Sequence, residues 1–249
     1  MREAVIVSTA RTPIGKAYRG AFNATPSPTL AGHAISHAVS RANVEGGDID
    51  DVIMGAALQQ GVQAPNIGRL SALAAGLPVT VAGQSVDRQC ASGLMAISMA
   101  AKQVMVDNMN VVVAGGVESI SMVQTPAMRV EPDKALIARH KDTYMSMIDT
   151  ANIVANRYGV SREDQDAYGL QSQQRTHAAQ QAGKFNDEII PLPSTMIMKN
   201  KETGETSKVD VTLEKDEGNR PETTLEGLSG LQPVMGPDTF ITAGNASQL

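Results

Sequence analysis

The residue of this chain best suited to covalent chemistry is Cys90, the only cysteine in the sequence. Residues 84–89 read as a loop, and a run of apolar residues at helical spacing follows. These are Leu94, Ile97, Ala101, Val104 and Met105. Cys90 is therefore expected where a helix begins, and the N–H groups and dipole of a helix N-terminus favour a thiolate over a thiol. Small residues at 91–93 would let a thioester carbonyl approach the backbone amides, so the segment suits acyl transfer. The alternative is a cysteine buried under the helix.

Five segments of the chain resemble motifs of the thiolase family, and they occur in the order expected for that family. They are residues 4–15, 89–94, 113–121, 161–166 and 242–247. Because the resemblance covers nearly the whole chain, it implies an acyl-cysteine intermediate on Cys90, with the backbone N–H of Cys90 as one oxyanion donor. It also implies coenzyme A thioesters as substrates, here acyl-CoA and acetyl-CoA, with no cofactor and no metal.

The sequence departs from the family pattern at two positions and at its end. Asp87 stands where asparagine is commoner, and its carboxylate would oppose a nearby thiolate unless Arg88 neutralises it. Asn152 replaces a glutamate, with no clear consequence for catalysis. Thiolases continue into a second domain that carries a histidine and a second cysteine, whereas the last residue here is Leu249. We therefore expect the 249 residues alone to leave an open sheet edge, to associate, and to accept an acyl group without completing a catalytic cycle.

Four residues are candidates for contacts with coenzyme A. Arg220 matches a position where the family places an arginine at the nucleotide end, although a solvated loop arginine is an equally good interpretation. Ser247 matches a serine near the pantetheine arm, and Ala243 contributes backbone there. Met147 matches a methionine that lines the acyl pocket, but methionine is more often filler in a core.

The resemblance implies an acyltransferase that condenses acetyl-CoA or cleaves a 3-ketoacyl-CoA, as in fatty acid metabolism. A decarboxylating condensing enzyme is the nearest enzymatic alternative, and the segments outside the cysteine region argue against it. The alternative from another class is a catalytically incomplete fragment or a non-catalytic module that binds coenzyme A. The resemblance also implies a homodimer or homotetramer.

Composition excludes several classes of partner. The net charge is −5, and no cluster of lysine or arginine occurs, which argues against nucleic acid and anionic membranes. One cysteine fits a reducing compartment, and neither a signal segment nor a long apolar run is present, so we expect a cytoplasmic protein. Aromatic residues make up 3% of the chain, so aliphatic side chains and 13 methionines must fill the core.

The first part of the chain alternates expected strands with expected helices. Strands are predicted at 5–8, 51–57, 80–86 and 111–114, the last buried on both faces, and helices at 29–42, 67–75 and after Cys90. Such alternation predicts an α/β fold, a layered thiolase-like domain with a mixed, mostly parallel sheet flanked by helices. Reactive groups of such sheets gather beyond the carboxyl ends of the strands, where Cys90 falls.

The second part of the chain is expected to form an inserted α+β loop domain. Residues 121–150 lack periodicity, and Ser161 begins a helix that runs to about Gly183 with a solvated, glutamine-rich face. Residues 195–213 read as a hairpin, and 216–230 read as a loop. We place the N-terminal domain at 1–120, the loop domain at 121–240 and a truncated return segment at 241–249.

Two tempting patterns are rejected. His33 and His37 have the spacing of metal ligands, but they lie opposite the apolar stripe of their helix and no third ligand accompanies them. Gly115 and Gly116 fit neither phosphate-binding glycine motif, and we expect them to permit close backbone packing near the nucleophile.

Overall fold

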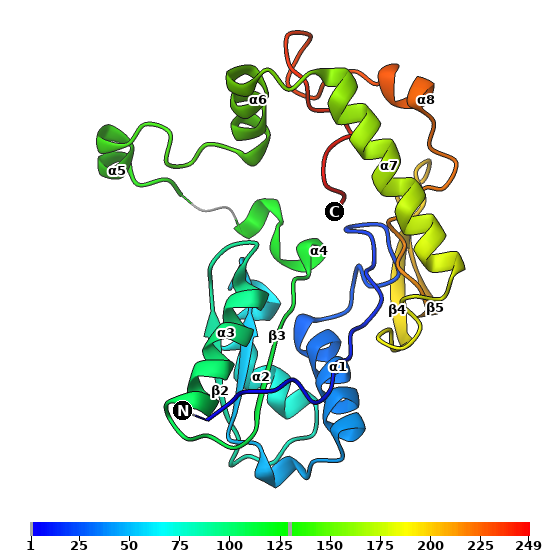
Figure 1. Cartoon of the computed structure of the whole chain (residues 1–249). Coiled ribbons are helices and arrows are strands. Elements are labelled where there is room, and N and C mark those ends of the chain that lie inside the picture. The colour runs from blue at the N-terminus through cyan, green and yellow to red at the C-terminus, as the bar shows by residue number, and fades with distance from the viewer. Residues whose placement is uncertain (1, 129–130) are drawn as a thin grey trace. The chain divides into compact units, whose positions relative to one another are not determined.

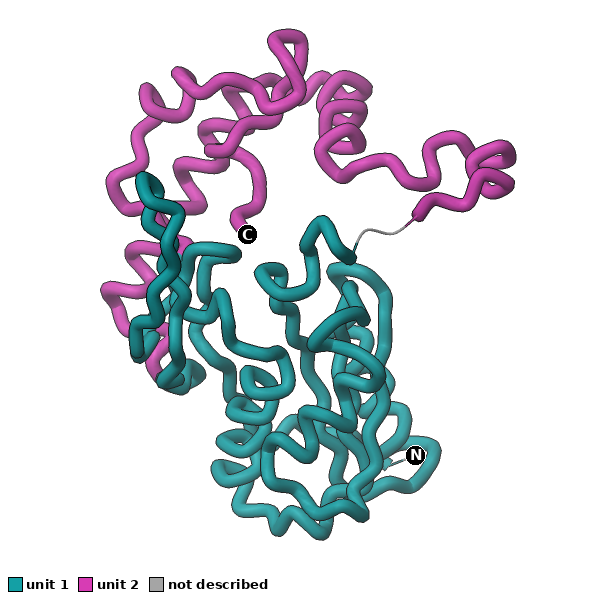
Figure 2. The backbone as a smooth tube through the Cα atoms, turned by 180° about the vertical axis from the view of Figure 1, so that it is seen from behind, with its two compact units in different colours: residues 1–129, 187–217 teal, residues 130–186, 218–249 magenta. Residues whose placement is uncertain are grey.

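The computed structural model describes residues 2–128 and 131–249, which divide into two compact units (Figure 2). Unit 1 holds residues 1–129 and 187–217, and unit 2 holds residues 130–186 and 218–249. Each unit is described by itself. The domain boundaries proposed at residues 120 and 240 stay a prediction.

Unit 1 is built on a three-stranded parallel sheet. Its strands are β1 (Asp51–Gly55), β2 (Ala82–Val86) and β3 (Val112–Gly116), in the order β2-β1-β3. The register pairs Gly55 with both Val86 and Gly116, so the carboxyl ends of the three strands lie at one edge. Every residue of the central strand β1 is buried. The predicted α/β fold with a parallel sheet is confirmed.

Helices cover both faces of this sheet, as Figure 1 shows. They are α1 (Ser27–Ala42), α2 (Ile67–Ala74) and α3 (Ser92–Met105). Side chains alternate along β1, so Val52 and Met54 pack in one apolar cluster with residues of α1 and α2. Ile53 points the other way and packs against Ala96 and Ala100 of α3. The result is a helix–sheet–helix sandwich in which each predicted helix is confirmed.

Two predictions about strands of unit 1 are wrong. Residues 5–8 form no strand, and Val5, Ile6 and Val7 remain 73%, 76% and 71% exposed. An apolar run becomes a strand only where a neighbour accepts its hydrogen bonds, and pairing begins at Arg11, whose N–H donates to Glu188 O at 2.9 Å. β3 packs on both faces, with Val113 in the cluster of α1 and α2 and Val112 in that of α3, but it is only half-buried, because within the described residues it is an edge strand that pairs with β1 alone.

Unit 1 also contains the predicted hairpin. Strands β4 (Leu192–Lys199) and β5 (Thr206–Leu213) pair in antiparallel fashion from Leu192–Leu213 to Lys199–Thr206. Gly204 in the turn has a φ of 75°, which glycine adopts without strain. Leu192 packs with Phe22 and Leu30, so the buried face of the hairpin completes a third apolar cluster.

Unit 2 is mainly helical. Its helices are α5 (Lys134–Arg139), α6 (Met147–Tyr158), α7 (Arg162–Gln181) and α8 (Leu225–Ser229). The long helix predicted from Ser161 is confirmed, and the Ser161 hydroxyl accepts a hydrogen bond from Asp164 N at 3.0 Å. Unit 1 adds the short helix α4 (Ile120–Val123), and the described residues also form three 3₁₀ turns. These turns are η1 (Gly46–Asp48), η2 (Gly61–Gln63) and η3 (Pro126–Met128).

Segments predicted to be irregular contain short helices instead. Residues 121–150 include most of α4, all of α5 and the start of α6, and α8 lies within 216–230. Side-chain caps account for three of these helices. Asp133, Ser146 and Thr224 accept hydrogen bonds from the first-turn N–H groups of α5, α6 and α8. A cap stabilises a short helix that has no apolar periodicity, so a search for periodicity misses it.

Candidate functional site

Cys90 lies in the loop between β2 and α3. Helix α3 begins at Ser92 with Ala91 as its N-cap, so Cys90 directly precedes the N-cap, as the sequence predicted. The Cys90 side chain is exposed. A thiol exposed beside a helix N-terminus can reach a ligand, which a cysteine packed in the core could not do.

Side-chain hydrogen bonds fix the shape of the turn that carries Cys90. The Ser92 hydroxyl accepts from Arg88 N at 2.8 Å and donates to Gln89 O at 2.5 Å. Gln89 has a φ of 49°, a left-handed conformation that costs energy for a residue other than glycine. Its N–H donates to Asp87 Oδ1 at 2.7 Å. The unusual carboxylate at position 87 therefore has a structural partner, the backbone that leads into Cys90.

Glycines let this turn lie directly against the carboxyl ends of the strands. A Cβ added to Gly55, the last residue of β1, would overlap the backbone of Ser92 and Gly93. A Cβ on Gly116, the last residue of β3, would lie 3.0 Å from Gly93 Cα. At Gly115 an added Cβ would meet only Met54, at 3.8 Å. The expected close packing near the nucleophile is therefore confirmed for Gly116, and Gly55 adds to it.

A buried glutamine, which the sequence analysis missed, ties the loop after β1 to the end of β3. Gln63 is fully buried, and its Nε2 donates to Glu118 Oε1 at 2.5 Å and to Leu58 O at 2.7 Å. Its Oε1 accepts from Ser27 Oγ at 2.8 Å and from Ser119 N at 2.7 Å. Every hydrogen-bonding group of this amide is thus engaged, which rigidifies the strand-end region.

Unit 2 contains a pocket with a volume of about 200 Å³. Its lining residues come from α7, from the segment around α8 and from the last residues of the chain. They are Gln173, Arg220, Glu222, Thr223, Thr224, Gly227, Leu228, Leu231, Gly244 and Gln248. The predicted residue Arg220 lines this pocket, whereas Ala243 and Ser247 adjoin the lining residues Gly244 and Gln248. Of the four predicted coenzyme A contacts, Arg220 alone lines this pocket.

Gln173 is a second residue that the sequence analysis missed. The glutamine-rich face of α7 was expected to be solvated, but Gln173 Oε1 accepts from Arg220 N at 2.8 Å and from Asn219 Nδ2 at 3.0 Å. Gln173 O accepts a further bond from Asn219 Nδ2 at 2.9 Å. These contacts hold the loop of Arg220 against α7, so at this position the solvated interpretation is wrong.

The other predicted site residues are placed as follows. Met147 is the first residue of α6, is 74% exposed and does not line the pocket. Its assignment to an acyl pocket stays a prediction. Cys90 belongs to unit 1, whereas Arg220, Ala243, Ser247 and Met147 belong to unit 2.

The described part of the chain contains no cluster of three or more His, Cys, Asp or Glu side chains that could hold a metal. His33 and His37 lie with their ring centroids 4.6 Å apart, and His33 Nε2 lies 3.0 Å from Pro191 O. Burial and then the neighbouring His37 lower the pKa of His33, against the opposing hydrogen bond with Pro191. Among the described residues, no helix is both long and apolar enough to cross a membrane.

A family profile described as "Thiolase, N-terminal domain" matches residues 4–249. The chain belongs to the thiolase family. It is 42% identical, over 251 residues, to the 3-ketoacyl-CoA thiolase of Bacillus subtilis, covering 100% of this chain and 63% of the relative. It is 38% identical to the β-ketoadipyl-CoA thiolase of Pseudomonas aeruginosa and to the 3-oxoadipyl-CoA/3-oxo-5,6-dehydrosuberyl-CoA thiolase of Escherichia coli, covering 99% of this chain and 63% of each relative. This thiolase-family chain thus spans somewhat less than two thirds of the length of these relatives.

Proposed function

We propose that this chain supplies the acyl-accepting part of an acyltransferase that acts on coenzyme A thioesters. The observation that carries the proposal is the exposed Cys90 at the start of α3, on a turn that glycines hold against the strand ends. Membership of the thiolase family supports the same assignment, because the relatives are named as thiolases that act on 3-ketoacyl-CoA and related thioesters.

The proposed step is a thioester exchange at Cys90. The Cys90 thiolate attacks the carbonyl carbon of the acyl-CoA, and the backbone N–H of Cys90 helps to stabilise the oxyanion. The bond between that carbon and the coenzyme A sulfur then breaks, so the acyl group stays on Cys90 and coenzyme A leaves as a thiolate, which takes up the proton that Cys90 gave up when it ionised. In the reverse direction coenzyme A thiolate removes the acyl group. The complete reaction would be condensation with acetyl-CoA or thiolysis of a 3-ketoacyl-CoA.

The pocket of unit 2 is the proposed site for the nucleotide end of coenzyme A. Arg220 lines this pocket and would offer its guanidinium to the phosphates. Ala243 and Ser247 precede the lining residues Gly244 and Gln248 in the chain, and we assign them to the pantetheine arm on the resemblance. Within the described residues no ion pair engages the Arg220 side chain, which leaves it available to an anion. We assign Met147 to the acyl end, on the resemblance alone.

The setting of this activity is also a proposal. We infer a cytoplasmic protein that works in fatty acid metabolism, supported by the single cysteine and by the name of the Bacillus subtilis relative. We propose a homodimer or homotetramer on the family resemblance alone. A non-catalytic module that binds coenzyme A is the second candidate, because the pocket and Cys90 belong to different units of the chain. The two candidates differ in whether an acyl group is transferred to the protein.

Acylation by acetyl-CoA distinguishes these candidates. We expect intact-mass analysis to show the addition of one acetyl group, and Cys90→Ser to abolish it, because a hydroxyl without a base is a far weaker nucleophile. Arg220→Ala should weaken binding of coenzyme A about tenfold, the scale of one charge-assisted hydrogen bond, while iodoacetamide alkylates Cys90 at an unchanged rate. Binding of coenzyme A without acylation would favour the non-catalytic module.

A further inference from the structure

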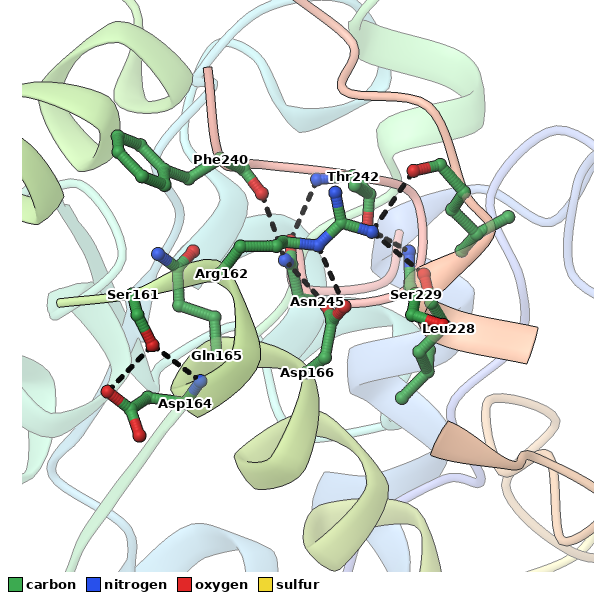
Figure 3. A network of polar contacts seen from close by, with 12 residues as sticks. Ser161, Arg162, Asp164, Gln165, Asp166, Leu228, Ser229, Phe240, Thr242 and Asn245 are labelled. Atoms are coloured by element: carbon green, nitrogen blue, oxygen red, sulfur yellow. Dashed lines mark hydrogen bonds and ion pairs between the residues drawn. The ribbon is translucent and has the colours of Figure 1, made fainter. Parts of the chain in front are cut away.

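One face of α7 carries a stripe of residues that contact the segments around the pocket. Arg162, Asp166, Gly169 and Gln173 are spaced by four, three and four residues, so they lie along one side of the helix. Gln173 lines the pocket, and a Cβ on Gly169 would lie 3.3 Å from Gly244 O. Arg162 and Asp166 do not line the pocket, and neither has a place in the proposed chemistry. Figure 3 shows their contacts.

Arg162 holds the segment that ends α8. Its Nη2 donates to Leu228 O at 2.8 Å and to Leu231 O at 3.0 Å, while its Nε donates to Asp166 Oδ2 at 2.8 Å. Leu228 and Leu231 line one side of the pocket. One guanidinium therefore fixes the backbone of both leucines relative to α7.

Asp166 holds the segment that carries Gly244. Asp166 is 1% exposed, and its Oδ1 accepts from Asn245 Nδ2 at 3.0 Å. Asn245 in turn donates to Phe240 O at 3.1 Å and accepts from Thr242 N at 2.8 Å. The side chain of Asn245 thus closes the turn around Gly244 and anchors it to α7.

The two held segments touch each other at the pocket. A Cβ added to Gly244 would lie 2.6 Å from Leu231 Cδ1 and would also overlap Leu228 Cδ2. The two segments are therefore in direct contact, so a shift of either one changes the shape of the cavity.

We propose that Arg162 and Asp166 are positioning residues, which set the two walls of the pocket through one ion pair without contacting its ligand. Arg162 fixes the wall that contains Leu228 and Leu231, and Asp166 fixes the wall that contains Gly244. The ion pair between Arg162 Nε and Asp166 Oδ2 connects the two walls. Only the identity of the ligand, coenzyme A, rests on the proposed function. The positioning role rests on the contacts within unit 2.

A swap of charge between Asp166 and Asn245 tests this role. Asp166→Asn leaves one of two donors, Arg162 or Asn245, without an acceptor, and Asn245→Asp places two carboxylates face to face. Each single variant should weaken coenzyme A binding about tenfold or more in calorimetry, at a temperature where circular dichroism shows a folded chain. The double variant restores the hydrogen bond between the two side chains, but neither the ion pair with Arg162 nor the bond to Phe240 O, so it should bind coenzyme A more tightly than Asn245→Asp without regaining the affinity of the unaltered chain.

Arg162→Lys supplies a second test, with Arg175→Lys as its matched control. An ammonium cannot reproduce the forked contacts to Asp166 and two carbonyls, so Arg162→Lys should weaken binding severalfold. Arg175 lies on the same helix and is exposed, and its side chain makes no hydrogen bond or ion pair within the described residues, so its lysine variant should bind as the unaltered chain does. Lower thermal stability with unchanged affinity in the Asp166 and Arg162 variants would show a merely structural role and overturn the proposal.

Hydrogen exchange gives a readout that does not depend on coenzyme A. Amides of both walls, residues 228–231 and 242–246, should exchange faster together in Asp166→Asn and recover in part in the double variant. Faster exchange at one wall alone, or no recovery, would contradict the proposed lock. Failure of the unaltered chain to bind coenzyme A would contradict the proposed function, and the exchange experiment would still decide the positioning role.

Discussion

Different interactions stabilise the interior of unit 1 and the interior of unit 2. Unit 1 contains three clusters of buried apolar side chains, which form around β1, α3 and the hairpin. In the part of unit 2 that the structure describes, few large apolar side chains are buried, and the buried residues include the polar Asn152, Asp166 and Thr242. Cys90 thus rests on a packed apolar sandwich, whereas the pocket walls depend on directional hydrogen bonds. An apolar core tolerates the exchange of one side chain for another of similar shape. A buried hydrogen-bond network is less tolerant, because replacing one donor or acceptor leaves its partner unpaired.

The largest effect is expected from an apolar truncation in unit 1. Ile53 is fully buried against α3, so Ile53→Ala should lower the free energy of unfolding by about 4 kcal/mol through lost burial and a cavity. Ile153 on α6 is 40% exposed, and Ile153→Ala should cost less than about 1 kcal/mol. Urea denaturation measures both variants. An equal loss of unfolding free energy in the two variants would contradict the proposal that apolar packing stabilises unit 1 more than unit 2.

A smaller effect is expected where glycine permits close packing. Gly55→Ala forces the added Cβ against the start of α3, which should cost about 2 kcal/mol and displace the turn of Cys90. Thermal unfolding and the rate of alkylation of Cys90 by iodoacetamide should both change. Gly47→Ala is the control, because nothing lies within 4 Å of its added Cβ. An unchanged alkylation rate in Gly55→Ala would show that the packing at the strand ends does not affect the reactivity of the Cys90 thiol.

The smallest effect concerns one hydroxyl of unit 2. Thr242 is fully buried and its Oγ1 accepts from Gly244 N at 3.1 Å, so Thr242→Val keeps the shape but leaves that N–H unpaired. We expect a loss of about 1 kcal/mol in the free energy of unfolding, together with weaker binding of coenzyme A. Thr212→Val on the exposed side of β5 should change neither quantity. If the two valine variants behaved alike, the polar network would not determine the pocket.

The apolar part of the fold was predictable from the sequence, because its pattern is local. β1 follows from an apolar run and α3 from the spacing after Cys90. The polar helix α7 was also predictable, because its Ser161 cap is equally local. Residues 5–8 show the limit of this reasoning, since an apolar run does not identify the strand that would pair with it.

The polar part of the site was much less predictable. The partners of Gln63 and Gln173 lie far along the chain, with Ser27 36 residues from Gln63 and Asn219 46 residues from Gln173. No local pattern reports such a contact. The spacing of Arg162, Asp166, Gly169 and Gln173 on one side of α7 was visible in the sequence, but it could be interpreted only once the segments facing it were known.

The path of the chain through unit 1 also has a consequence for the order of folding. Arg11 Nε pairs with Glu188 Oε1 at 2.8 Å across 177 residues, and Thr25 Oγ1 bonds Ser194 Oγ across 169 residues. By contrast, β1, β2 and β3 come from one stretch of the chain, so their contacts close much shorter loops. Because contacts distant in sequence slow folding, the sheet should nucleate first and the β4–β5 hairpin should dock afterwards. During synthesis on the ribosome, the sheet and its helices would thus form first, and the apolar cluster of Phe22 and Leu30 would stay exposed until residues 187–217 emerge.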